Sequence, residues 1–124
     1  MSTTVIVADD DQDIRSLVSI AVGKAGLELL ASVSDGALAL EAIQKHQPDL
    51  AILDVSMPEM TGLEVCRAVR GDSSIGDVRI LLLSASVDEQ SQSIGIEAGA
   101  DYFLAKPFSP RELATWLSVG KEPR

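Results

Sequence analysis

The feature that most constrains the fold of this 124-residue chain is a regular alternation between short apolar runs and longer segments of helical periodicity. Five apolar runs are short enough to be strands: Val5–Val7, Leu29–Val33, Leu50–Leu53, Ile80–Leu83 and Tyr102–Leu104. Alternating strands and helices are typical of α/β proteins with a parallel sheet. The sequence therefore predicts a doubly wound α/β fold, in which five helices cover a five-stranded parallel sheet.

The helical segments differ in how clearly the sequence marks them. The first has its apolar residues three, four and seven positions apart, on one face: Ile14, Leu17, Val18, Ala21 and Ala25. The next two are expected at about 36–45 and 63–70, and the fourth, at about 89–98, has the weakest apolar pattern. The fifth has the clearest start, because Ser109-Pro110-Arg111-Glu112 combines a capping box with proline at the first helical position.

The composition fits one domain with an aliphatic core. Hydrophobic residues make up 46% of the chain but aromatic residues only 3%, so Leu, Ile, Val and Ala must form the core. The only cysteine, Cys66, excludes an internal disulfide and suits a reducing compartment. We expect a single domain over residues 1–124, with a core at about 4–119 and a short tail at 120–124.

The charge of the chain excludes several classes of partner. The net charge is −9 and no run of Lys and Arg is present, so neither nucleic acid nor an anionic membrane surface should bind it directly. The apolar runs are too short to cross a bilayer, and the first residues lack the pattern of a signal peptide. The sequence thus predicts a cytoplasmic protein.

Polar residues follow the predicted strands, at the edge where doubly wound proteins carry their sites. In chain order they are Asp9, Asp10 and Asp11 after the first strand, Asp54 at the end of the third, Ser84 at the end of the fourth, and Lys106 and Pro107 after the fifth. If the first and third strands are neighbours, Asp9, Asp10 and Asp54 converge. Taken singly, these residues could be a helix cap, a turn residue and an exposed lysine; their shared position favours a site.

Three converging carboxylates need positive charge nearby, because two unit charges about 4 Å apart repel by roughly 4 kcal/mol at an effective dielectric constant of 20. Oxygen ligands on irregular loops suit a hard cation, and a few carboxylates completed by water suit Mg²⁺ better than Ca²⁺. Lys106 offers a second positive charge, and Ser84 offers a hydroxyl donor. Such a set predicts a phosphoryl-transfer site, in which a carboxylate can itself be the nucleophile.

These residues resemble the receiver domains of two-component response regulators over nearly the whole chain, from Val5 to about Leu117. The resemblance is carried by four segments: Val7-Ala8-Asp9-Asp10-Asp11, residues 48–58 with Gly62, Leu83-Ser84-Ala85 and Ala105-Lys106-Pro107-Phe108. It implies a flavodoxin-like fold with strand order 2-1-3-4-5. It also implies a regulatory phosphoacceptor that promotes its own phosphorylation and dephosphorylation and is not an enzyme in the ordinary sense.

The resemblance assigns a role to each residue of the site. It makes Asp54 the phosphoacceptor, and it places Mg²⁺ on Asp9, Asp10, Asp54 and the backbone carbonyl of Ser56. It makes Lys106 and Ser84 the partners of the phosphoryl oxygens. Phe103 becomes the aromatic switch residue together with Ser84, and a cis peptide bond precedes Pro107. Phe103 stands where many members have Tyr, so its ring has no hydroxyl to hydrogen-bond.

The same resemblance implies partners. The phosphodonor would be a histidine kinase or a histidine phosphotransfer protein, and the chain's only histidine, His46, is expected at the surface at the end of the second helix. The signal would pass to a downstream protein, or to an output domain in a longer chain. One large DNA-binding subgroup pairs a second acidic residue in the fifth strand with a basic residue in the fourth helix. This chain has Tyr102 at that strand position and no Lys or Arg in the fourth helix, although Arg111 matches the subgroup. The case for that subgroup's dimer is therefore weakened.

Two other functions share parts of this pattern. A phosphatase of the haloacid dehalogenase type would need a second aspartate two residues after Asp54, where this chain has Ser56. A flavodoxin-like FMN carrier would need a loop rich in Ser, Thr and Gly after the first strand, where Asp9-Asp10-Asp11 would repel the FMN phosphate. Both therefore fit the sequence less well than the phosphoacceptor.

Overall fold

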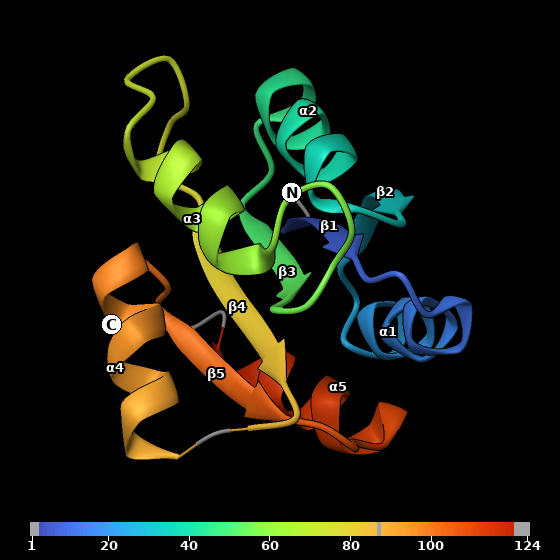
Figure 1. The fold of residues 1–124 in the computed structure, drawn as a ribbon. Helices are drawn as coiled ribbons and strands as arrows, with labels where there is room; N and C mark the ends of the chain where they lie inside the picture. Colours follow the sequence, from blue (N-terminus) through green and yellow to red (C-terminus); the bar gives the residue numbers. More distant parts are fainter. Residues whose placement is uncertain (1–2, 87, 121–124) are drawn as a thin grey trace.

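The computed structural model describes residues 3–86 and 88–120, which form a five-stranded parallel sheet with helices on both faces (Figure 1). The strands are β1 Thr4–Ala8, β2 Glu28–Val33, β3 Leu50–Asp54, β4 Arg79–Ser84 and β5 Tyr102–Ala105. The helices are α1 Gln12–Lys24, α2 Gly36–His46, α3 Gly62–Arg70, α4 Glu89–Ala98 and α5 Pro110–Gly120. The strand order is β2-β1-β3-β4-β5, which confirms the expected doubly wound, flavodoxin-like topology.

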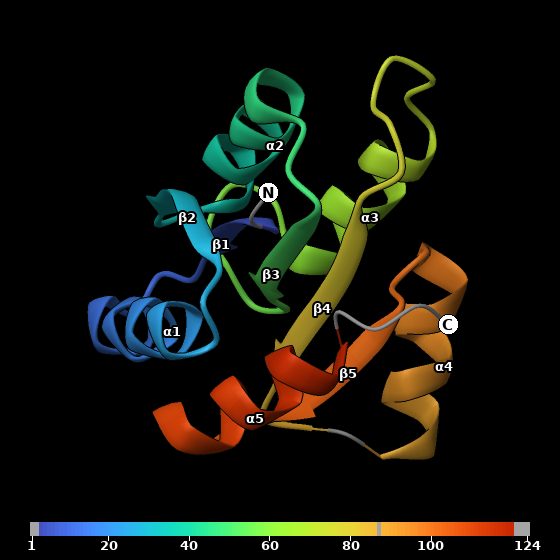
Figure 2. The same ribbon diagram turned by 180° about the vertical axis from the view of Figure 1, so that it is seen from behind.

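The sheet separates two apolar layers because successive side chains of a strand point to opposite faces. In β1, Val5 and Val7 pack with α1 and α5, whereas Ile6 and Ala8 pack with α2 and α3. The two views in Figures 1 and 2 show the same division, with α1 beside α5 and with α2, α3 and α4 on the opposite face. The central strands are buried on both faces, so the predicted aliphatic core is a double layer.

Local capping residues begin the helices where the sequence places them. The side chains of Asp11, Asp35 and Asp88 accept hydrogen bonds from backbone N–H groups in the first turns of α1, α2 and α4. Thr61 and Glu64 form a full capping box at α3, and Ser109 and Glu112 form the box predicted for α5. These caps end the loops that leave the carboxyl ends of the strands, and so they fix where the site residues stand.

At the amino ends of β4 and β5, away from the predicted site, the side chain of Arg70 at the end of α3 joins several backbone segments. The guanidinium of Arg70 donates to the carbonyls of Gly99 and Val78, at 2.9 and 2.7 Å, and to the carboxylate of Asp101 at 2.8 Å. The same carboxylate oxygen accepts the backbone N–H of Ile80 at 2.8 Å. Arg70 therefore ties the end of α4 and the start of β5 to the start of β4.

The fold also shows where the single histidine and the single cysteine of the chain lie. His46 is exposed at the end of α2, and Cys66 is fully buried in α3. Burial raises the pKa of the Cys66 thiol to about 12, so this cysteine is an apolar core residue. None of the described helices is long and apolar enough to span a membrane. Of the expected tail, residues 121–124 lie outside the described part of the chain.

Candidate functional site

The predicted site residues meet at the carboxyl edge of the sheet because β1 pairs directly with β3 and β3 with β4. Asp9 follows β1, while Asp54 and Ser84 are the last residues of β3 and β4. Lys106 follows β5, which pairs with β4. Four consecutive strand ends therefore bring together groups as far as 97 positions apart in the chain, from Asp9 to Lys106.

Three carboxylates form the centre of the site. Asp9, Asp10 and Asp54 each offer one oxygen, and these oxygens lie within 4.8 Å of one another. Asp9 is fully buried and Asp54 is nearly so, whereas Asp10 is exposed to solvent. Asp9 Oδ1 accepts the backbone N–H of Asp11, but its buried Oδ2 has no donor with hydrogen-bond geometry among the residues that the structure describes. An acceptor buried in this way beside two other carboxylates fits a hard cation with oxygen ligands, and one open side leaves room for water.

Lys106 supplies the positive charge of this site. Its ammonium lies 3.0 Å from Asp54 Oδ1, in a hydrogen bond, and 2.9 Å from Asp9 Oδ2. The second contact is close enough for a strong ionic attraction, although its angles do not meet hydrogen-bond criteria. Burial lowers the pKa of Lys106, but the two carboxylates outweigh it and the pKa is raised. Lys106 therefore stays cationic over the physiological range.

The pKa of Asp54 is raised, and burial is the main cause. The hydrogen bond from Lys106 opposes this effect, and the negative charge of Asp9 adds to it. The backbone N–H of Ser56 gives a smaller stabilisation of the carboxylate. Burial thus outweighs the ammonium of Lys106 in setting the direction of the shift, so the Asp54 carboxylate would gain from binding a further cation or a proton.

Two glycines let the loop after β3 pack tightly against its neighbours. A side chain on Gly62 would overlap the carbonyl oxygen of Asp54, and one on Gly36 would overlap the carbonyl of Met60. Gly62 also donates its N–H to the carbonyl of Val55 at 3.0 Å. This loop carries Ser56, whose carbonyl the resemblance makes a metal ligand, so the two close approaches hold that carbonyl's segment in place.

Arg15 contacts the acidic loop and was not among the predicted site residues. Its Nη1 donates to the backbone carbonyl of Asp9 at 2.7 Å, from one turn inside α1. The N–H of Asp9 donates to the carbonyl of Val33 on β2. Both backbone groups of Asp9 are thus held. The only signal of this in the sequence is a basic residue six positions after Asp9, which is too common to identify a role.

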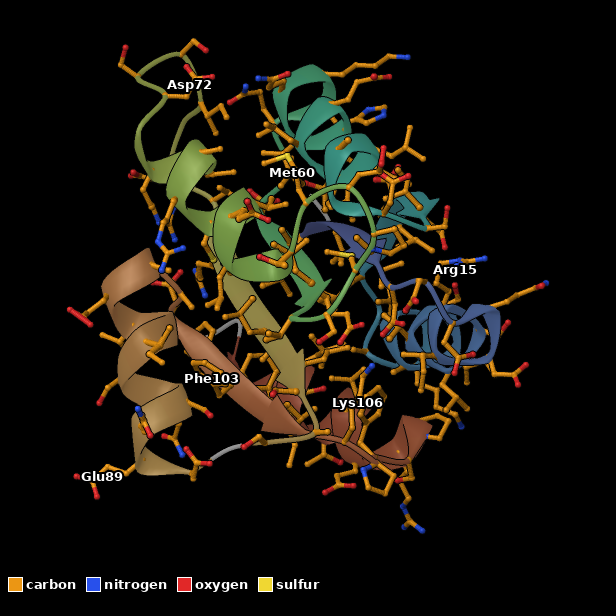
Figure 3. The ribbon with its side chains drawn as sticks, in the orientation of Figure 1. Arg15, Met60, Asp72, Glu89, Phe103 and Lys106 are labelled. Carbon is orange, nitrogen blue, oxygen red and sulfur yellow. The ribbon has the colours of Figure 1, made fainter. Side chains whose placement is uncertain are left out.

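Ser84 and Phe103 lie beside a pocket next to the carboxylates. The Ser84 hydroxyl donates to the carbonyl of Ser86 at 2.8 Å and accepts the N–H of Ser86 at 3.1 Å. Phe103 is half-buried, and it shares with Ser84 the lining of a pocket of about 290 Å³ that also includes Val55, Leu63 and Ile94. Figure 3 shows Phe103 between α4 and the sheet and Lys106 at the end of β5. The two expected switch residues are thus neighbours of one cavity.

The segment that carries Lys106 has the geometry implied by the resemblance. The Lys106–Pro107 peptide bond is cis, and Phe108 is buried against α1 and α5. The N–H of Lys106 donates to the carbonyl of Ser84 at 2.9 Å, so the backbone stays paired with β4 up to the lysine. The backbone from which the Lys106 side chain extends is therefore held by a hydrogen bond of Lys106 itself.

The comparisons with known proteins agree with this geometry. The sequence model of the family described as the response regulator receiver domain matches residues 5–118. The transcriptional regulatory protein GltR of Pseudomonas aeruginosa is 43% identical over 110 residues, which are 89% of this chain and 45% of that protein. The DNA-binding response regulator MtrA of Mycobacterium tuberculosis is 38% identical over 113 residues, which are 91% and 48%. The chain thus spans about half the length of these curated relatives.

Solved structures show the same fold at similar identity. The signal receiver domain of the response regulator NarL from Mycobacterium tuberculosis superposes with a TM-score of 0.89 at 34% identity, covering 99% of this chain and 98% of that one. The chemotaxis response regulator CheY4 of Vibrio cholerae gives a TM-score of 0.88 at 36% identity, covering 96% and 98%. By sequence and by fold, the chain belongs to the response regulator receiver domain family.

Proposed function

We propose that this receiver domain is a phosphorylation switch in which Asp54 accepts a phosphoryl group from a histidine kinase or a histidine phosphotransfer protein. The observation that carries the proposal is the convergence of Asp9, Asp10 and Asp54 around the ammonium of Lys106. An oxygen of Asp54 attacks the phosphorus of the phosphohistidine. The phosphorus–nitrogen bond breaks, the imidazole leaves with the electron pair and takes up a proton, and Asp54 becomes an acyl phosphate.

The residues around Asp54 favour this transfer by position and charge. Asp9, Asp10, Asp54 and the carbonyl of Ser56 would hold Mg²⁺, which supplies positive charge for the phosphoryl oxygens. Lys106 would neutralise another of these oxygens, and its place is fixed by the backbone pairing with Ser84. The hydroxyl of Ser84 donates to a third. Hydrolysis uses the same arrangement with water as the nucleophile, so the domain promotes both its own phosphorylation and its dephosphorylation.

The conformational part of the proposal follows from the present partners of Ser84. Its hydroxyl donates to the carbonyl of Ser86 and accepts the N–H of Ser86, so it must give up the hydrogen bond that it donates before it can donate to a phosphoryl group on Asp54. That movement enlarges the pocket which Phe103 already lines, and the ring moves further into it. The surface of α4, β5 and α5 changes as a result, and it is there that a downstream protein or an output domain recognises the phosphorylated form.

Phosphorylation is tested by incubating the protein with acetyl phosphate and Mg²⁺ and measuring the intact mass. We expect the gain of one phosphoryl group, its loss in chelator and its absence in Asp54→Asn. Asp13→Asn is the matched control, because Asp13 is an exposed aspartate in the first turn of α1 that lies outside the carboxylate cluster. A label that persisted in Asp54→Asn would contradict the assignment of the phosphoacceptor.

The switch is tested with beryllofluoride, a mimic of the phosphoryl group, by comparing backbone amide chemical shifts with and without it. We expect changes at Asp54, Ser84 and Ser86 that continue to Phe103 and along α4. Changes confined to the loops around Asp54 would leave a phosphoryl acceptor without a conformational output and would contradict this part of the proposal.

A further inference from the structure

A glycine lies in the middle of α4, at a place where helix propensity alone would disfavour it. Glycine is the least favourable helix residue after proline, because it loses the most backbone freedom when it is ordered. Gly95 is nevertheless one of two buried residues in α4, with Ala98. The larger apolar residues of this helix, Ile94 and Ile96, are 38% and 64% exposed. The helix therefore turns its small residues toward the sheet, whereas Ile96 faces outward and Ile94 lines the pocket that it shares with Phe103.

The ring of Phe103 occupies the space that a side chain at Gly95 would need. A Cβ atom there would overlap the Cζ and Cε2 atoms of the ring and would lie 3.3 Å from Cδ1 of Leu82. Gly23 in α1 is the contrasting case, because a Cβ atom there would meet nothing within 4 Å. Gly95 thus leaves a slot in the buried face of α4, and the aromatic ring of β5 fills it.

The two ends of α4 are held in different ways. The carbonyl of Gly99, just after the helix, is bound by Arg70, which also binds Val78 and Asp101. At the other end, Asp88 caps the helix and accepts the hydroxyl of Ser86, the residue whose backbone Ser84 holds. The carboxyl end of α4 is therefore tied to the starts of β4 and β5, whereas its amino end is tied to the segment that Ser84 contacts.

We propose that Gly95 is a positioning residue of the switch. Its missing side chain seats the Phe103 ring against the helix backbone, so that the position of the ring and the position of α4 depend on each other. When the ring moves toward Ser84, the slot empties and the backbone of α4 at Gly95 can approach the sheet. This inference rests on the proposed switch and adds the contact by which the movement of one ring reaches the helix surface.

The contact between the Phe103 ring and Gly95 can be observed directly by NMR of the full chain labelled with ring-¹³C phenylalanine. The chain contains two phenylalanines, Phe103 and Phe108, so the spectrum is simple and the buried Phe108 is an internal control. We expect nuclear Overhauser contacts between the Phe103 ring and the α-protons of Gly95, together with a ring-current shift of those protons. Both should weaken on addition of beryllofluoride and Mg²⁺, while the Phe108 signals keep their contacts with α1 and α5.

Substitutions can distinguish two effects of alanine at Gly95, its clash with the Phe103 ring and its higher helix propensity. Gly23→Ala should keep or raise the midpoint of thermal unfolding, because alanine favours the helix and meets no obstacle. Gly95→Ala should lower that midpoint and shift the Phe103 ring signals without moving those of Phe108. In a Phe103→Ala background the slot is empty, so Gly95→Ala should then raise the midpoint as Gly23→Ala does. This reversal of sign would show that the Phe103 ring sets the cost at Gly95. The loss of the contact between Phe103 and Gly95 on addition of beryllofluoride is the readout that a purely structural role for Gly95 would not give.

Three results would overturn the inference, and they are distinguishable. If Gly95→Ala behaves like Gly23→Ala in the unmodified background, the slot does not hold the ring. If beryllofluoride shifts the amides around Asp54 but leaves the contact between Phe103 and Gly95 unchanged, Gly95 has no part in the switch. If beryllofluoride and Mg²⁺ change nothing around Asp54, the proposed function itself fails, and the role of Gly95 in it fails as well.

Discussion

The ammonium of Lys106 lies 3.0 Å from Oδ1 of Asp54, across 52 positions of the chain, and this contact joins the ends of two strands that are not neighbours in the sheet. β4 stands between β3 and β5, so Lys106 reaches past Ser84 to bind the acid. The contact places a cation where the carboxylates would otherwise repel one another.

Asp54→Asn should stabilise the fold at neutral pH. The pKa of Asp54 is raised by burial, so folding favours the protonated acid, and the charged form carries a penalty that is fully present above the raised pKa. The penalty disappears below the ordinary aspartate range, where the side chain is protonated in both states. We expect a gain in the free energy of unfolding on the order of 1 kcal/mol at pH 7 that vanishes in acid, measured by urea unfolding across pH. A gain that grew on acidification would contradict this sign.

Asp10→Ala should abolish most Mg²⁺ binding, since it removes the exposed member of the carboxylate cluster without disturbing the core. Asp13→Ala removes an equal charge from an exposed position nearby and should weaken binding only slightly. Mg²⁺ binds only deprotonated ligands, and the pKa of Asp54 is raised. As the pH is lowered, the Mg²⁺ affinity of the unmodified protein should therefore begin to fall at a higher pH than it would with ligands of ordinary aspartate pKa. Isothermal titration calorimetry measures both effects, and equal losses in the two variants would argue against the assigned ligands.

Lys106→Met should destabilise the metal-free protein by about 1–3 kcal/mol, because it leaves buried carboxylates without their cation. Mg²⁺ at millimolar concentration should restore part of this loss, since a ligand that binds only the folded state stabilises it. Lys45→Met, on the exposed surface of α2, is the control and should respond little to Mg²⁺. Urea unfolding with and without Mg²⁺ tests this, and a Lys106→Met protein as stable as the control would refute it.

Lys106→Arg should keep the charge yet slow phosphorylation, because a planar guanidinium does not fit where a compact ammonium bridges Asp9 and Asp54. Its free energy of unfolding should therefore lie nearer to that of the unmodified protein than Lys106→Met does. The rate of phosphorylation by acetyl phosphate measures the functional loss. An unchanged rate would mean that Lys106 contributes charge alone.

Arg70→Lys should cost about 1–2 kcal/mol of stability although the charge is kept. Three separate nitrogens of Arg70 donate to groups on two segments, and one ammonium cannot reach all of them in the same geometry. Arg67→Lys, exposed one turn earlier in α3, is the control and should be nearly neutral. Chemical unfolding compares the two, and similar costs would show that the geometry of the Arg70 side chain does not matter.

The elements were predictable because their signals are local. The start of α5 follows from Ser109, Pro110 and Glu112, and each strand bound was located to within one residue of the observed bound. The strands extend slightly further, for example to Thr4 and Ala8, because the pairing of backbone groups continues past the residues that apolar patterns identify. The carboxylate cluster was predictable for a topological reason, since parallel strands end at one edge.

The contacts of Gly95, Arg15 and Arg70 were not predictable from the sequence. Gly95 belongs to the predicted helix with the weakest apolar pattern, and nothing near it in the sequence indicates that the Phe103 ring packs against it. Arg70 reaches residues 8, 29 and 31 positions away, and nothing in its own neighbourhood indicates those partners. Such contacts depend on how helices dock on the sheet, and docking is set by the summed packing of many side chains.

The two edge strands of the sheet, β2 and β5, affect whether molecules of this protein associate at high concentration. An edge strand exposes unpaired N–H and C=O groups that can pair with another chain and begin aggregation. Here β2 carries exposed Glu28 and has a break in register opposite Val5 and Ile6, while β5 has only four residues and is soon followed by Pro107, which has no N–H to donate. Together with the net charge of −9, these features disfavour the joining of molecules edge to edge.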